Sequence, residues 1–501
     1  MSTAGTASSQ PDFIGIRIDG GPAPFRIYQQ HFAGASVAEG TSGEVGFASI
    51  SLHGRWHHPP TTRPPMVQLR VVHEDTAQVV VPWQDATAQE SVVDRGEQVL
   101  PSASEPPSWR HTFHRVPAGG LYRIETRLVL DARGNVEWSP HGDVVHHIGV
   151  GDLWVIAGQS NAAGYGRGPV NDPPRLGVHV LRNDETWDIA THLLNETTRS
   201  THPNMEGSNP GHSPYLRFGK DLQDALGYPI GLIATSLGGS ALDKWNPVEN
   251  PDAVLFKNML HCISIAGGRV RGMVWYQGES DANEVAAPTY ERRFADFAIA
   301  TRQALGDITL PILIAQLNRV VTPQTEASHR AWTIIREAQR HVSMLAGPAG
   351  VVPTLDLPLS DLIHNSPDGN LTLGTRKARL ALERVYGKPF SLPVPDVGEA
   401  VFDAERRHIF LTYNSVPTHL VLIGAGEADF RVEDESGVVP VKNAVVKVPN
   451  VVRLELERLP TGATVVHGAW GANPPAFLRD AEANIPALGF YGLPVQEASK
   501  E

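Results

Sequence analysis

Five short apolar runs, separated by segments with helical periodicity, constrain the fold of residues 151–387 more than any other feature. Such runs are typical of strands that are buried on both faces of a sheet. They cover residues 153–157, 230–235, 272–276, 312–317 and 351–357. The segments between them end at glycines such as Gly227 and Gly306, as helices often do. The alternation predicts an α/β fold with a doubly wound, parallel, five-stranded sheet, whose ligand crevice lies beyond the carboxyl ends of its strands.

Strand-like segments bounded by turn residues flank this α/β region on both sides. Residues 122–130 alternate polar and apolar side chains and lead into a turn at residues 131–134, the pattern of a half-exposed antiparallel strand. Further strands follow the proline-rich stretch at residues 389–395. We therefore predict an N-terminal β-sandwich-like module at residues 1–147, an α/β domain at residues 148–388 and a C-terminal all-β module at residues 389–501.

Composition excludes several kinds of partner. The 501 residues include 42 Lys+Arg against 54 Asp+Glu, a net charge of −12. No dense basic run is present to neutralise phosphates, so nucleic acid is not an expected partner. No apolar stretch reaches the ~18 residues that a membrane span needs. Residues 1–11 lack the basic start and apolar run of a secretory signal, so we expect a cytoplasmic protein, or a periplasmic or secreted one if an export signal has been lost. The sequence does not indicate an oligomeric state.

The single cysteine, Cys262, excludes a disulfide framework and every multi-cysteine metal site. Its apolar neighbours predict a buried, inert thiol.

Residues suited to chemistry follow the first two apolar runs. Ser160 lies in the sequence GQSN at residues 158–161, where a turn next to glycine can present its hydroxyl to a ligand. A serine in such a loop more often caps a helix. The second run leads to Gly238 and Gly239, whose backbone N–H groups can approach a ligand closely and point at one anionic oxygen. For glycines by themselves, a tight turn is the simpler interpretation.

The third run ends in WYQGESD at residues 275–281. The side-chain amide of Gln277 can donate a hydrogen bond to a developing negative oxygen without titrating, which makes it a candidate oxyanion donor. Glu279 could orient a neighbouring side chain. An N-terminal capping cluster before the helix at Pro288 is an equally good interpretation of these residues.

The last run leads to Asp361 and His364. At this spacing the aspartate can accept the imidazole Nδ1–H and leave Nε2 facing the crevice as a general base. A helix-start pair and a metal-binding pair are the alternatives. Metal is disfavoured because neither residues 158–161 nor residues 277–281 supply a histidine or cysteine ligand. We therefore expect no metal and no other cofactor, and we expect all four motifs to share one edge of the sheet.

Taken in order, these four motifs resemble the ordered blocks of the SGNH hydrolase superfamily. The GQSN form of the first is similar to the branch that contains sialate O-acetylesterases and related carbohydrate acetylesterases of plants and bacteria. The resemblance covers residues 148–387. Two positions depart from the pattern: Ala162 stands where relatives often have methionine, and Gln277 stands where the wider superfamily uses asparagine.

The resemblance implies a role for each motif. Ser160 would be the nucleophile, His364 the general base and Asp361 the partner of that base. The oxyanion hole would combine the backbone N–H groups of Ser160 and Gly239 with the side-chain amide of Gln277. Four further residues would support the site: Gln159, Asn161, Gly238 and Glu279.

The expected activity is that of a serine esterase that removes O-acetyl groups from carbohydrate through an acyl-enzyme. Acetylated polysaccharide, oligosaccharide or sialic acid would be the substrate. Two alternatives remain, an esterase or thioesterase on longer acyl chains and a non-catalytic carbohydrate-binding protein that keeps the fold. Some tryptophans could stack on sugar rings, although tryptophan more often fills a core. These are Trp56, Trp83, Trp187 and Trp245.

Overall fold

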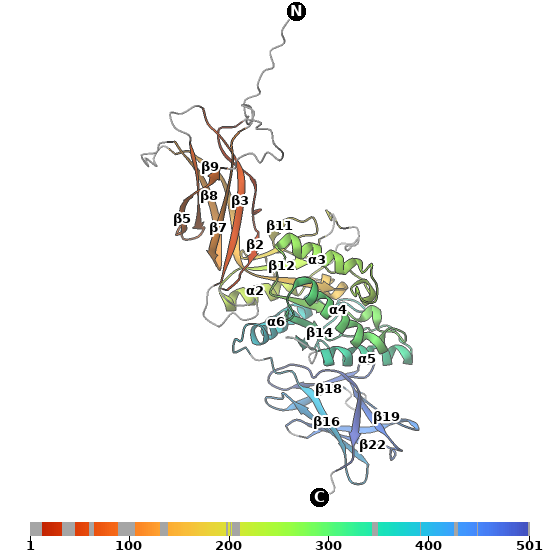
Figure 1. The fold of residues 1–501 in the computed structure, drawn as a ribbon. Helices are drawn as coiled ribbons and strands as arrows, with labels where there is room; N and C mark the ends of the chain where they lie inside the picture. The colour runs from red at the N-terminus through yellow and green to blue at the C-terminus, as the bar shows by residue number, and fades with distance from the viewer. Residues whose placement is uncertain are drawn as a thin grey trace, which may run out of the picture.

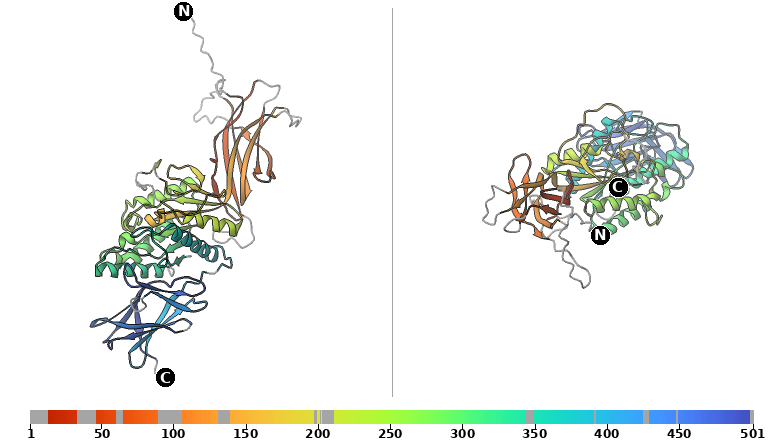
Figure 2. Two further views of the ribbon diagram at one scale, coloured as in Figure 1. Left: turned by 180° about the vertical axis from the view of Figure 1, so that it is seen from behind. Right: turned by 90° about the horizontal axis from the view of Figure 1, so that it is seen from above.

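The structure is a computed structural model of an elongated molecule with three hydrophobic cores, one in each of three successive parts of the chain (Figure 1). It describes residues 13–32, 46–59, 65–88, 106–130, 139–196, 199–200, 202, 211–342, 349–390, 392–424, 429–447 and 449–498. The view from behind shows an N-terminal β module and a C-terminal β module at opposite ends of a helix-rich centre (Figure 2, left).

The N-terminal core lies among antiparallel strands arranged in the orders β1-β3-β7-β6 and β5-β4-β8-β9. Alternate residues of β3, such as Ile50 and Leu52, are buried in this core, while the residues between them are exposed. The strand predicted at residues 122–130 is confirmed as part of β8. The strands are β1 (Gly15–Gly20), β2 (Ile27–Gln29), β3 (Phe47–His57), β4 (Met66–His73), β5 (Val79–Asp85), β6 (Thr87–Ala88), β7 (Ser108–Pro117), β8 (Gly119–Val129) and β9 (His141–Gly158).

Strand β9 belongs both to the N-terminal module and to the central sheet. Its first part pairs antiparallel with β8, and from Asp152 onward it pairs parallel with a central strand. The predicted boundary between residues 147 and 148 therefore falls inside one continuous strand. Because β9 ends at Gly158, two residues before Ser160, one continuous strand joins the N-terminal module to the candidate site.

The central sheet has the order β11-β10-β12-β9-β13-β14-β15. Six of these strands, β10, β12, β9, β13, β14 and β15, pair with their neighbours in parallel, whereas β11 pairs antiparallel with β10 at the edge. All five predicted runs contribute strands to it. The parallel part also includes β10, so the predicted count of five is one too low. Its other strands are β10 (Val178–Leu181), β11 (Trp187–Ile189), β12 (Ile230–Ala234), β13 (Gly272–Tyr276), β14 (Ile312–Ala315) and β15 (Ala349–Val352).

Strand β10 is not apparent in the sequence because His179 interrupts its short apolar run. The imidazole is fully buried and its Nδ1 lies 2.6 Å from the carbonyl oxygen of Phe25. Burial lowers the pKa of His179 to about 4, against the opposing effect of that hydrogen bond. The histidine is therefore a neutral core residue.

Helices cover both faces of the central sheet, as two tryptophans show. Trp154 of β9 is paired with Gly272 of β13, so Trp275, three residues further along β13, faces the opposite side. The Trp154 ring packs edge-on against Phe218 of α2, whereas Trp275 packs against Phe294 of α4. The helices are α1 (Ser160–Ala163), α2 (Tyr215–Leu226), α3 (Val254–Ala266), α4 (Tyr290–Leu305), α5 (Glu326–Val342) and α6 (Pro367–Arg384).

The C-terminal module contains an eight-stranded sheet of order β20-β19-β23-β25-β16-β17-β22-β21 and the pair β18-β24. It docks on α5, where the fully buried Arg336 donates to the carbonyls of Ala469 and Gly471, and Arg330 pairs with Glu433. The strands are β16 (Asp396–Phe402), β17 (His408–Asn414), β18 (Leu420–Gly424), β19 (Phe430–Asp434), β20 (Gly437–Val439), β21 (Val441–Lys447), β22 (Val451–Leu456), β23 (Thr464–Gly468), β24 (Ala476–Asp480) and β25 (Phe490–Gln496).

Cys262 lies on α3 and is buried, as the sequence predicts. Burial raises the pKa of its thiol to about 12, so the reactive thiolate is scarce at neutral pH. Among the described helices, none combines the length and apolar character needed to cross a membrane.

Candidate active site

Ser160 follows the carboxyl end of β9 and is the first residue of α1. The N-cap position is taken by Gln159, so the serine does not cap this helix. Gly158 makes the sharp turn possible: its φ is +131°, and a Cβ there would lie 2.1 Å from the carbonyl oxygen of Tyr276. The serine hydroxyl makes no hydrogen bond to any residue that the structure describes.

Asn161 joins the serine turn to the histidine loop. Its Oδ1 accepts the backbone N–H of Asn365 at 3.1 Å, and its Nδ2 donates to the carbonyl oxygen of Ile363 at 3.3 Å. Because these two residues flank His364 in the chain, and Asn161 directly follows Ser160, the backbone of the His364 loop is held beside the serine turn. Asn161 and Asn365 are 204 positions apart in the sequence, and the fold brings their loops together.

Asp361 and His364 form a pair on one loop. Oδ2 of Asp361 lies 2.7 Å from Nδ1 of His364, while Oδ1 accepts the backbone N–H groups of Ile363 and His364. Burial alone would raise the pKa of Asp361, but these hydrogen bonds outweigh it and hold the pKa below its ordinary value. The aspartate therefore stays ionised, and it accepts the Nδ1 proton and leaves Nε2 as the available basic nitrogen.

The ring of Tyr165 stacks on the imidazole of His364, with centroids 4.8 Å apart and planes 26° from parallel. This contact and the Asp361 bond fix the orientation of the ring. No hydrogen bond joins Nε2 of His364 to Oγ of Ser160, although the structure describes both residues. Hydrogen bonds between catalytic groups are often long without substrate and tighten when it binds.

Glu279 supports Asn161 from the opposite side. Its Oε1 accepts Nδ2 of Asn161 at 2.8 Å, and its Oε2 is buried with no partner among the described residues. Burial raises the pKa of Glu279, and the effect exceeds the lowering by Asn161 and by the nearby His364. The carboxyl group orients the asparagine that holds the two loops together.

Gly239 leaves a backbone donor available on the other side of Ser160. It follows β12 with a φ of +65°, and a Cβ there would meet nothing within 4 Å. Its N–H donates to no residue that the structure describes, unlike that of Leu237, which bonds to the carbonyl oxygen of Gly158 at 3.1 Å. Gly238 lies in the same loop. The loop is thus tied to the end of β9 and keeps one N–H free.

Gln277 is fully buried, and its amide hydrogens already have acceptors. Nε2 donates to Oδ2 of Asp281 at 2.6 Å, and the carbonyl oxygen of Ser240 and Oε1 of Gln159 lie at 3.2 and 3.3 Å. Since an amide nitrogen has only two hydrogens, none remains for a substrate oxygen. These hydrogen bonds argue against the predicted role of Gln277 as an oxyanion donor, and in this structure the residue links the loops around Ser160.

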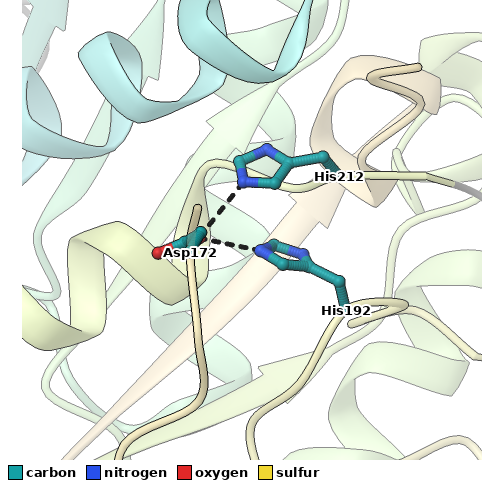
Figure 3. Close-up of side chains that lie close together, drawn as sticks. All are labelled: Asp172, His192 and His212. Carbon is teal, nitrogen blue, oxygen red and sulfur yellow. Dashed lines mark hydrogen bonds and ion pairs between the residues drawn. The ribbon is translucent and has the colours of Figure 1, made fainter. Parts of the chain in front are cut away.

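A second polar cluster joins Asp172, His192 and His212 (Figure 3). Oδ2 of Asp172 lies 2.8 Å from Nε2 of His192 and 3.1 Å from Nε2 of His212, and Oδ1 pairs with Lys220 of α2. The cluster is close to the site because Gly166, six residues after Ser160, pairs with His212 in a β-bridge. Sequence analysis missed it, because its members come from separate loops that carry no periodic pattern.

The hydrogen bonds of this cluster do not suit a metal ion. The backbone N–H of Ser213 donates to Nδ1 of His192 at 3.3 Å, which places the proton of this imidazole on Nε2, the atom that would have to bind the metal. The Lys220 ammonium already neutralises Asp172. Burial would raise the pKa of Asp172, but its three donors hold it well below the ordinary value. The cluster is a brace between the loops and α2, although Nδ1 of His212 is buried without a partner among the described residues.

The brace predicts a pH-dependent stability. Burial lowers the pKa of His192, and this effect outweighs the opposing effect of the hydrogen bond to Asp172. As the pH falls below ~6.5, the imidazole is therefore protonated in the unfolded chain before it is protonated in the folded protein. Stability therefore falls as the pH drops from 7 to 5, by up to about 1.4 kcal/mol per pH unit from this residue. His192→Gln keeps a donor for Asp172 and does not titrate. Urea unfolding at both pH values should show a smaller loss in this variant; an equal loss would contradict the assignment.

The candidate sugar-stacking tryptophans serve mainly as packing residues. Trp245 and Trp187 are buried in the central core, and Trp56 packs against the N-terminal core. Two guanidinium groups lie over the ring of Trp83, at 4.6 and 4.1 Å from its centroid. None of the four offers an uncovered ring at the carboxyl end of β9.

Comparison with known proteins places this site in context. Residues 150–383 match the family described as carbohydrate esterase, sialic acid-specific acetylesterase. Sialate O-acetylesterases of Pongo abelii and Homo sapiens are 29% and 28% identical over 211 residues, which cover 35% of this chain and 39% of each relative. The chain thus spans about two fifths of the length of these relatives.

A solved carbohydrate acetylesterase from Xanthomonas citri has a similar fold across nearly the whole molecule. Its TM-score is 0.60 at 18% identity, and the alignment covers 95% of this chain and 98% of that one. At this identity the likeness shows the fold alone.

Proposed function

We propose that the protein is a serine esterase that removes O-acetyl groups from carbohydrate, on the premise that residues 150–383 match the carbohydrate esterase, sialic acid-specific acetylesterase family. One observation carries the proposal: Asn161 holds the loop of the Asp361–His364 pair against the turn that presents Ser160. A nucleophile, a base and an acid that orients the base are the groups that acyl transfer requires.

The reaction begins with attack of the Ser160 hydroxyl on the acetyl carbonyl. As the Oγ–carbon bond forms, Nε2 of His364 takes the hydroxyl proton, and Asp361 stabilises the resulting imidazolium. The carbonyl oxygen becomes an oxyanion, which accepts hydrogen bonds from the backbone N–H groups of Ser160 and Gly239. His364 then returns the proton to the departing sugar oxygen. Water repeats the sequence on the acyl-enzyme and releases acetate.

Two features favour catalysis over carbohydrate binding alone. The Ser160 hydroxyl and Nε2 of His364 have no hydrogen-bond partner within the described chain, so both remain available to a substrate. The Asp361 bond fixes the tautomer that a general base needs. A protein that only bound sugar would have no physical need for a basic nitrogen held in this state.

Acetate release from defined substrates tests the proposal. The panel contains acetylated xylan, xyloglucan and pectin and O-acetylated sialic acid, together with aryl acetate and aryl octanoate. We expect acetate from at least one carbohydrate and faster hydrolysis of the aryl acetate. Faster hydrolysis of the octanoate would favour an esterase of longer acyl chains, and carbohydrate binding without hydrolysis of any ester would favour a binding protein.

A further inference from the structure

The side chain of Gln159 is fixed at its oxygen and free at its nitrogen. Oε1 accepts the backbone N–H of Ser280 at 3.2 Å and lies 3.3 Å from Nε2 of Gln277. Nε2 of Gln159 donates to none of the described residues, and it is not among the buried atoms that are sealed from solvent without a partner. Although the residue as a whole is only 3% exposed, its amide donor remains open to a small ligand.

The position of this amide complements the two backbone donors. Strand β9 lies between β12 and β13 in the sheet, so the loop of Gly239 follows one neighbour and residues 277–281 follow the other. The bonds to Oε1 direct the Gln159 side chain toward the second loop. Three N–H donors are therefore free near the turn, within the part of the chain that the structure describes: the backbone N–H of Ser160, the backbone N–H of Gly239 and the side-chain amide of Gln159.

We propose that Nε2 of Gln159 is the third donor to the oxyanion formed at Ser160, and that Gln277 is the positioning residue that orients it. This inference rests on the proposed esterase function and assigns to Gln159 the role that the buried Gln277 amide does not fill. As the Oγ–carbon bond forms, the π electron pair of the carbonyl moves onto its oxygen, which accepts the Gln159 N–H; the proton of Oγ goes to His364, and Gln159 transfers none.

The surroundings of Gln159 prepare this donor before substrate arrives. Gln277 is itself locked by Asp281 and by the hydroxyl of Tyr290, which donates to its Oε1 at 2.9 Å. Ser280 adds a backbone donor to Oε1 of Gln159. A donor held in place by the fold needs no reorganisation in the transition state, which is the condition under which oxyanion stabilisation is most effective.

Two substitutions of Gln159 test the assignment. Gln159→Glu keeps an oxygen to accept from Ser280 and replaces the donor by a negatively charged acceptor, and Gln159→Met removes both polar groups. With aryl acetate, we expect kcat to fall by about 10²- to 10³-fold in each, with KM changed only a few-fold. Gln303→Glu, which adds the same charge on the exposed end of α4, is the matched control and should keep wild-type kcat.

A thionoester, whose sulfur is a weaker hydrogen-bond acceptor, separates a donor role from a structural one. The loss in the Gln159 variants should be several-fold smaller with aryl thionoacetate than with aryl acetate, because a purely structural defect would slow both esters alike. Gln277→Ala should also lower kcat, and it should lower the Tm because the buried partners of its amide lose their hydrogen bonds. Wild-type kcat in both Gln159 variants, or equal losses with the two esters, would overturn the inference. If the Gln159 inference failed in this way, the esterase function would still be supported when wild type hydrolyses the esters and Ser160→Ala does not. A wild-type protein inactive on every ester would refute the function itself.

Discussion

Replacing Ser160 by alanine lowers esterase activity by about 10⁶-fold, with the folded structure intact, if Ser160 is the nucleophile. The magnitude is that of removing a nucleophile that acts as one unit with its base. The change deletes one oxygen, and this oxygen makes no hydrogen bond within the described chain, so no internal contact is lost. The measurement is kcat/KM for aryl acetate, with Tm recorded alongside.

Ser264→Ala is the matched control, because Ser264 is an exposed serine near the end of α3, ahead of β13, whereas the site lies beyond the carboxyl end of that strand. It should keep wild-type kcat/KM. Activity of Ser160→Ala within tenfold of wild type would mean that another group attacks the ester.

The second large effect concerns His364. His364→Ala should lower kcat/KM by about as much as Ser160→Ala, because an unactivated hydroxyl is a poor nucleophile at neutral pH. The double variant should be no slower than either single variant, since residues that act as one unit lose their contribution only once. The measurement is kcat/KM of all three proteins with the same aryl acetate.

His114→Ala, at an exposed position on β7, controls for loss of an imidazole. If Ser160 and His364 acted independently, the two fold-losses in kcat/KM would multiply in the double variant, and this result would contradict the prediction.

Local patterns explain why parts of this structure could be predicted from sequence. The apolar runs of the central strands report burial on both faces directly, and the pairing of Asp361 with His364 depends only on a spacing of three residues. Strand β10 was not predicted because His179, a titratable residue, is buried in neutral form within it.

The parts that could not be predicted depend on contacts between distant segments. Gln277 has the chemistry of an oxyanion donor, but acceptors from residues 159, 240 and 281 use its hydrogens. The Asp172 brace joins loops that are 20 and 40 residues away in the chain. Which donors stay free is decided only when the loops are packed, so a sequence shows the candidates without showing which of them is occupied.

Covalent trapping by a fluorophosphonate tests most directly whether Ser160 and His364 act together. Oγ of the serine forms a bond to phosphorus, fluoride leaves, and His364 takes the hydroxyl proton. We predict one adduct per chain by intact mass, located on Ser160 by peptide mapping, and formed far more slowly in His364→Ala. An adduct on another residue, or equally fast labelling without the imidazole, would contradict the account.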